Sequence, residues 1–208
     1  MSSVAVAEQP HAAGHAAGHA AGHSQEFIGQ PLGKVGVWWF LASEIMVFGG
    51  LIGSYILTRI ANGGWAAERA HVNTTLAFIN TVVLVTSSLT VVEAHAAADN
   101  EQRGRARRFL LATVLLGCTF LCIKGYEYSR EIEHGFTPAA GVFWSFYYTM
   151  TGLHGFHVLI GIVINFVLFL ATGGAAWPRI KHRIEYAGLY WHFVDVVCIF
   201  LFPLLYLA

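Results

Sequence analysis

The chain has 208 residues, of which 56% are hydrophobic and only 12% are charged, and its formal net charge at neutral pH is zero. A soluble domain of this size carries about 25% charged residues. The composition therefore excludes an ordinary soluble protein and predicts an all-α, polytopic membrane protein. A net charge of zero also gives no indication of nucleic-acid binding.

Residues 1–33 differ in composition from the rest of the chain. Four histidines recur at every fourth position: His11, His15, His19 and His23. A segment of Gly, Ala and His offers no apolar face to bury, so we expect a disordered tail that precedes a transmembrane domain at 34–208. The segment lacks the basic start and apolar stretch of a signal peptide. Loose binding of Ni, Cu or Zn by these histidines is the alternative to a merely solvated tail.

Five long apolar segments follow, and each exceeds the ~20 residues needed to cross a bilayer. They run approximately over 34–60, 72–97, 106–128, 139–172 and 183–208. Because a backbone in hydrocarbon must satisfy its own hydrogen bonds, each is predicted to be a helix. The fourth is too long for one perpendicular span, so it either tilts or begins with an interfacial turn at 143–148.

The positive residues between the segments predict the orientation of the chain. One side holds eight: Lys34, Arg103, Arg105, Arg107, Arg108, Arg179, Lys181 and Arg183. The other side holds Arg59, Arg69 and Arg130, together with Lys124 near a helix end. Eight against four predicts the N-terminus inside and, after five crossings, the C-terminus outside. The loops are too short to hold a catalytic domain.

Ionisable residues inside the apolar segments are the candidate functional residues. A charge at mid-bilayer costs roughly 2.5–3.5 kcal/mol or more, so it is retained only where it faces protein or water. Glu44 follows Lys34 by ten residues, which places it ~15 Å deep and favours a buried, neutral or hydrogen-bonded carboxyl. The remaining candidates lie in the last three segments: Glu127, His154, His157, Glu185, His192 and Asp195.

Spacing groups some of these candidates. His154 and His157 are three residues apart, as are His192 and Asp195, so each pair shares one face of its helix. Three interpretations remain open: ligation of haem or metal, a proton path, or satisfied structural contacts with helices or lipid head groups. The spacing favours structural contacts, because two histidines three apart on one helix are no metal signature by themselves.

The motifs, taken in order, resemble those of subunit III of haem-copper oxidases, the cytochrome c and quinol oxidases. The resemblance covers nearly all of 34–208. Its motifs are Ser43-Glu44, Ile79-Asn80-Thr81, Gly125-Tyr126-Glu127-Tyr128, the TGxHGxHV pattern at 151–158 and the WHFVDVV pattern at 191–197. Each motif is modest alone, but five in order on five predicted helices form a specific combination. The chain is similar to the five-helix form of the family, which lacks the first two helices of the mitochondrial form.

This resemblance implies a non-catalytic integral subunit of a proton-pumping terminal oxidase in aerobic respiration. Such a subunit packs directly on subunit I, stabilises it and supports proton uptake. Subunit II, a small subunit IV, phospholipids and a supercomplex with a quinol-oxidising complex are further candidate partners. Haems and copper are expected in partner subunits, with no cofactor, metal or catalytic residue in this chain. The expected location is the bacterial cytoplasmic (inner) membrane.

Two alternatives remain at this stage. One is an accessory protein of a nitric-oxide reductase system that resembles subunit III. The other, from a different class, is a stand-alone haem- or metal-binding membrane protein.

Overall fold

The structure is a computed structural model that describes residues 32–69, 71–174 and 177–207. The predicted tail at 1–33 therefore lies almost entirely outside the described residues. Residues 39–208 form one structural unit, separate from the residues before Trp39, and every contact discussed below lies within it.

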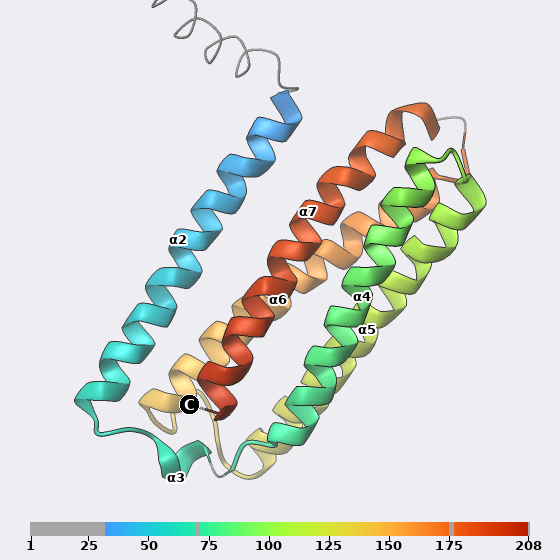
Figure 1. Ribbon diagram of the computed structural model, residues 1–208. Helices are drawn as coiled ribbons and strands as arrows, with labels where there is room; N and C mark the ends of the chain where they lie inside the picture. Colours follow the sequence, from blue (N-terminus) through green and yellow to red (C-terminus); the bar gives the residue numbers. More distant parts are fainter. Residues whose placement is uncertain (1–31, 70, 175–176, 208) are drawn as a thin grey trace, which may run out of the picture. The chain divides into compact units, whose positions relative to one another are not determined.

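The described residues are helical throughout, apart from short turns (Figure 1). The long helices are α2 (Leu32–Ala61), α4 (Thr74–Asp99), α5 (Arg103–Glu133), α6 (Val142–Ala171) and α7 (Trp177–Phe202). A short helix α3 (Ala66–Arg69) follows α2, and a π-helical turn η1 (Pro203–Leu207) continues α7. Five of the helices in the described part are long and apolar enough to cross a membrane, which confirms the predicted number of spans.

The helix ends differ from the predicted ones where polar residues flank an apolar run. Helix α5 extends to Glu133, beyond the predicted end at 128, because its last turns carry charged residues that can remain helical outside hydrocarbon. Helix α7 begins at Trp177, before the predicted start at 183. Residues 143–148 are part of α6, so the predicted interfacial turn is wrong and the first turns of α6 are continuous with the rest.

Helices α4, α5, α6 and α7 pack side by side in a closed order, with α4 against α5 and α7, and α6 against α5 and α7 (Figure 1). Trp191 on α7 is fully buried in this bundle, and its indole N–H donates to Ser87 Oγ at 2.9 Å. A Cβ at Gly161 would lie 2.7 Å from the Trp191 ring, and one at Gly117 would lie 3.0 Å from it. These two glycines therefore make room for the indole between α5 and α6.

Helix α2 is the least enclosed of the five. Only 11% of the residues in its apolar stretch are buried, against 50% of those in the apolar stretch of the last helix. Its second half contributes Phe48 and Tyr55 to an aromatic cluster with Trp65, Phe143 and Tyr147. Tyr55 also donates a hydrogen bond to the Leu204 carbonyl at 3.3 Å. These contacts fix the end of α2 that leads into α3.

Candidate functional site

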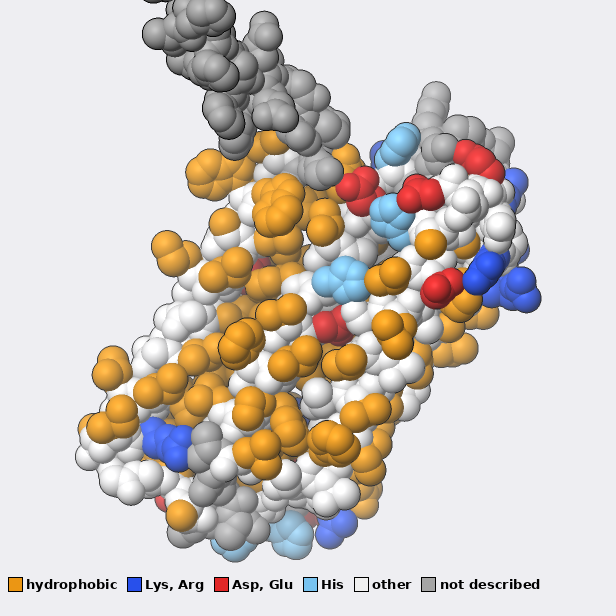
Figure 2. Space-filling view, in the orientation of Figure 1, with side chains coloured by type: hydrophobic (Ala, Val, Ile, Leu, Met, Phe, Trp, Pro, Cys, Tyr) orange, Lys and Arg blue, Asp and Glu red, His pale blue; other side chains and the backbone are white. Residues whose placement is uncertain are grey.

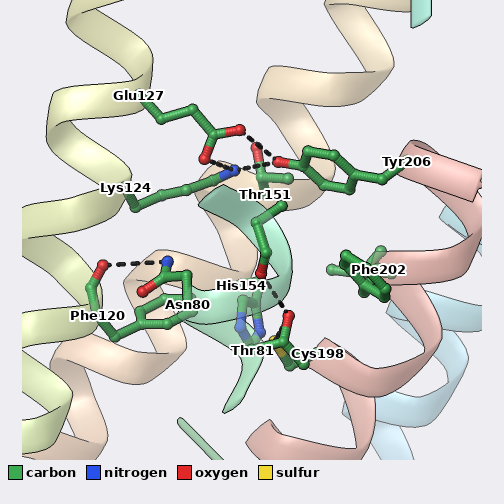
Figure 3. Close-up of a pocket in the computed structure, with 12 residues that line it drawn as sticks. Asn80, Thr81, Phe120, Lys124, Glu127, Thr151, His154, Cys198, Phe202 and Tyr206 are labelled. Carbon is green, nitrogen blue, oxygen red and sulfur yellow. Dashed lines mark hydrogen bonds and ion pairs between the residues drawn. The ribbon is translucent and has the colours of Figure 1, made fainter. Parts of the chain in front are cut away.

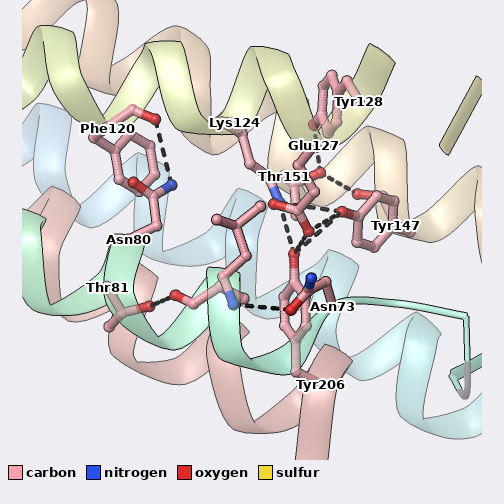
Figure 4. A network of polar contacts seen from close by, with 12 residues as sticks. Asn73, Asn80, Thr81, Phe120, Lys124, Glu127, Tyr128, Tyr147, Thr151 and Tyr206 are labelled. Atoms are coloured by element: carbon pink, nitrogen blue, oxygen red, sulfur yellow. Dashed lines mark hydrogen bonds and ion pairs between the residues drawn. The ribbon is translucent and has the colours of Figure 1, made fainter. Parts of the chain in front are cut away.

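A buried network of four side chains joins α5, α6 and η1 (Figure 4). Lys124 and Glu127 lie one turn apart on α5, and their Nζ and Oε2 atoms are 3.0 Å apart. Tyr147 comes from the second turn of α6 and Tyr206 from η1. The Lys124 and Glu127 side chains are only 11% and 2% exposed. The α5 ion pair is therefore enclosed by phenol rings rather than by solvent.

The hydrogen bonds of this network account for all three donors of the Lys124 ammonium. Its Nζ donates to Glu127, to Tyr147 OH at 3.2 Å and to Tyr206 OH at 2.6 Å. Each phenol in turn donates to Glu127 Oε1, at 2.8 Å from Tyr147 and 2.7 Å from Tyr206. An ammonium has three donors and a phenol one donor, so every donor in the network has an acceptor within it. This arrangement suits an ammonium–carboxylate pair.

A second pair of ionisable groups joins α2 to α6. His157 Nε2 lies 3.0 Å from Glu44 Oε2, with side-chain exposures of 7% and 17%. His157 Nδ1 lies 2.8 Å from the Leu153 carbonyl oxygen. Because a carbonyl can only accept, Nδ1 must carry a proton and donate it. One proton then lies between His157 Nε2 and Glu44 Oε2, and either group can carry it. The net charge of the pair is zero in both cases.

His154, one turn before His157, does not join that pair. It lies against Phe120 with ring centroids 5.6 Å apart, and it lines a small cavity together with Asn80 and the Lys124–Glu127 pair (Figure 3). Neither ring nitrogen of His154 has a hydrogen-bond partner among the described residues. The two histidines therefore make separate contacts and do not form one ligand set.

The predicted pair on the last helix also separates. His192 Nδ1 lies 2.6 Å from Ser88 Oγ on α4. Asp195 is buried beside the same Ser88, but neither of its carboxyl oxygens makes a hydrogen bond of normal geometry in the part of the chain that the structure describes. His192 and Asp195 thus both belong to the packed region between α4 and α7, but no bond joins them.

Glu185 lies in the third turn of α7, since this helix begins earlier than predicted. It lines an open groove of about 290 Å³ between α4 and α7 with His95, Asp99 and His192. Figure 2 shows Asp, Glu and His side chains gathered on the face formed by these helices. Apolar residues such as Val92 and Leu189 line the same groove, so its surface is amphipathic.

The network around Glu127 contains three residues that sequence reasoning missed as site residues: Lys124, Tyr147 and Tyr206. Lys124 was assigned to a helix end as a topology signal, but it lies nine residues before the end of α5 and is buried. A signal was present, because a Lys and a Glu three apart inside an apolar run favour an intrahelical pair. The two tyrosines offered no such signal, since their contacts come from other helices.

The chain is similar to proteins of one known family. Residues 15–208 match the family model described as Cytochrome c oxidase subunit III. A protein named Cytochrome c oxidase subunit 3 from Corynebacterium diphtheriae is 36% identical over 177 residues, which cover 83% of this chain and 86% of the relative. Proteins of the same name are 36% identical over 177 residues in Bacillus subtilis and 35% over 175 in Thermostichus vulcanus, covering 83% of this chain and 84% and 86% of the relatives. The chain belongs to the cytochrome c oxidase subunit III family.

The motifs that suggested this family lie on five different helices of the subunit III fold. Glu44 lies on α2, Asn80 on α4, Glu127 on α5, His154 on α6 and Asp195 on α7. In residues 32–69, 71–174 and 177–207, no group of three or more His, Cys, Asp or Glu side chains is arranged to hold a metal ion. Five membrane-length helices and membership of this family make the chain a multi-pass membrane protein.

Proposed function

We propose that the chain is a non-catalytic integral subunit of a proton-pumping haem-copper terminal oxidase in aerobic respiration, where it stabilises subunit I and supports proton uptake. The observation that carries this proposal is the match to the subunit III family across all five spans. The internal contacts support it, because Glu44, His157, Lys124 and Glu127 bond to one another in pairs instead of converging on a shared ligand.

The proposed partners follow from the family. Subunit I is the direct partner, subunit II and a small subunit IV complete the complex, and the haems and copper reside in those partners. Phospholipids and a supercomplex with a quinol-oxidising complex are further proposed contacts. Helix α2 supports a role in such contacts, since Trp39, Met46 and Leu57 expose large apolar side chains that need lipid or protein cover.

We place the subunit in the bacterial cytoplasmic membrane, with the N-terminus inside and the C-terminus outside. The positive residues support this orientation more strongly once Lys124 is removed from the outer group, because it is buried within α5. Eight residues then oppose three, Arg59, Arg69 and Arg130, and positive residues are enriched on the cytoplasmic side.

Purification from membranes through a tagged copy of this chain tests the proposal. We expect co-purification of a haem-copper complex that reduces O₂, with the haem absorption belonging to the other subunits. Expression of the chain alone is the matched control, and it should give no haem band. A Soret band that follows the isolated chain and is lost in His154→Ala or His157→Ala would contradict the proposal, as would co-purification with a nitric-oxide reductase instead of an oxidase.

A further inference from the structure

The starting point is the small cavity that His154 lines between α4, α5, α6 and α7 (Figure 3). Its volume is about 30 Å³. A water molecule needs roughly 10–15 Å³ on the same measure, so the cavity has room for about one or two waters and for nothing larger. Its lining includes polar residues from different helices, among them Asn80, Thr81 and Thr151, but most of the surface facing the cavity is apolar.

Two of the lining side chains have unmet hydrogen-bonding capacity. Asn80 is 3% exposed and donates from Nδ2 to the Phe120 carbonyl at 3.3 Å, but its Oδ1 has no partner among the described residues. His154 is 4% exposed, and the described residues likewise provide no partner for either ring nitrogen. A neutral imidazole carries one donor and one acceptor. Asn80 Oδ1 therefore needs one hydrogen-bond donor, and His154 needs one donor and one acceptor.

Water fits this demand better than an ion does. A water molecule offers two donors and two acceptors, and buried waters typically make about three hydrogen bonds to otherwise unsatisfied polar groups. The charged residues that line the cavity, Lys124 and Glu127, are paired at 3.0 Å, so the site carries no net charge to select a cation or an anion. All three Lys124 donors are already used within the network.

Glu127 lines a second pocket as well as this cavity. The second pocket is polar, has a volume of about 130 Å³ and is also lined by Arg130, Glu131 and His134. This pocket lies at the end of α5, where the chain turns towards α6. Glu127 therefore borders both a pocket large enough for several waters and the smaller cavity.

We propose that the cavity is an internal water site, in which one or two water molecules bridge Asn80 and His154 to the Lys124–Glu127 pair. The waters complete the hydrogen bonds of the Asn80 and His154 side chains, for which the described residues offer no partner. The site thereby connects the motif residues Asn80 and His154 to the network on α5.

The direct test is an electron cryo-microscopy map of the assembled complex at a resolution that shows ordered water. We expect density within about 3.2 Å of Asn80 Oδ1 and of one His154 ring nitrogen. An Asn80→Leu complex should lose this density. Asn165→Leu is the matched control, because Asn165 is also buried on a helix with an unpartnered Oδ1 but lies outside the cavity lining; it should keep the density. An empty cavity in a map that resolves neighbouring waters, or a His154 ring bonded to protein, would overturn the proposal.

A second measurement does not depend on map resolution. A double-mutant cycle combines Asn80→Leu with His154→Phe and reads the unfolding temperature of the complex. Since residues that share a partner are not additive, the double variant should lose less than the sum of the single losses. The cycle of Asn165→Leu with His154→Phe should be additive. Equal additivity in both cycles would count against a shared water.

Discussion

Among the described residues, the two least exposed pairs of ionisable side chains lie in membrane-length helices, and their surroundings differ. Glu127 and Lys124 belong to one helix, and two phenols complete their hydrogen bonds. Glu44 and His157 belong to two helices, and their direct contact is one bond at 3.0 Å. The first pair has all its partners within the chain. In the second pair, Glu44 lies on α2, which is the least buried of the five helices.

The two pairs therefore have different roles. The Lys124–Glu127 pair stabilises this chain itself, whereas the Glu44–His157 pair depends on neighbouring molecules. An ion pair whose partners are all internal serves the fold of this chain, and its loss leaves a buried charge without compensation. A pair that holds a single proton and remains partly exposed depends on whatever covers α2 in the assembled complex, either lipid or another subunit.

Glu127→Leu should cause the largest loss of stability. It leaves the Lys124 ammonium buried beside two phenols, and breaking a buried pair on one side costs about 3–5 kcal/mol. The unfolding temperature of the complex and the amount of this subunit in membranes should both fall. Glu133→Leu, at the exposed end of the same helix, is the matched control and should have little effect.

The double variant Lys124→Met with Glu127→Leu sharpens this prediction. Replacement of both partners by apolar residues is often neutral, and the Tyr147 and Tyr206 hydroxyls, 3.1 Å apart, can still bond to each other. We therefore expect recovery of most of the lost stability. A double variant as unstable as Glu127→Leu alone would show that the network acts through more than its charge balance.

Glu44→Leu should have a smaller effect, about 1–3 kcal/mol, because it leaves His157 Nε2 without its partner. Glu44→Gln can still donate an N–H to Nε2 if His157 is neutral, so it should behave almost like the parent. The measurement is the unfolding temperature, together with the decay of oxidase activity over many turnovers. If Gln is as harmful as Leu, the pair is ionised and its charge, not its hydrogen bond, is what matters.

The sequence predicted the existence of these spans better than their pairing. Length and apolar composition suffice for five helices, because hydrocarbon admits few other backbone structures. Depth alone predicted that Glu44 is buried, but its side chain is 17% exposed. Its partner His157 is 113 residues away, and no spacing rule reports which helix faces which. Lys124 was misassigned because a lysine near a run of charged residues resembles a helix end. The spacing of three between His192 and Asp195 predicted a shared helix face, but it gave no sign that His192 bonds to Ser88.

Asp195→Ala tests a carboxyl that belongs to neither kind of pair. Removal of its buried side chain from the α4–α7 contact leaves a small void, worth about 1 kcal/mol. We expect normal initial turnover, followed by a shorter working life or weaker retention of the subunit. Asp195→Asn, which conserves shape, is the control. An immediate and complete loss of turnover in a fully assembled, haem-loaded complex would place Asp195 in the chemistry and contradict the accessory role.

Deletion of residues 1–24 should have the smallest effect of all. The segment is rich in Gly, Ala and His and offers no apolar face with which to bind the bundle or a partner helix. Neither ionisable pair has a member in this segment, so the contrast between them should survive the deletion unchanged. The measurement is the amount of assembled oxidase in membranes, with a His→Ala version of the four repeats as the matched control. A loss of complex in the deletion alone would assign the tail a binding role through its backbone or length, and a loss in both would assign that role to the imidazoles.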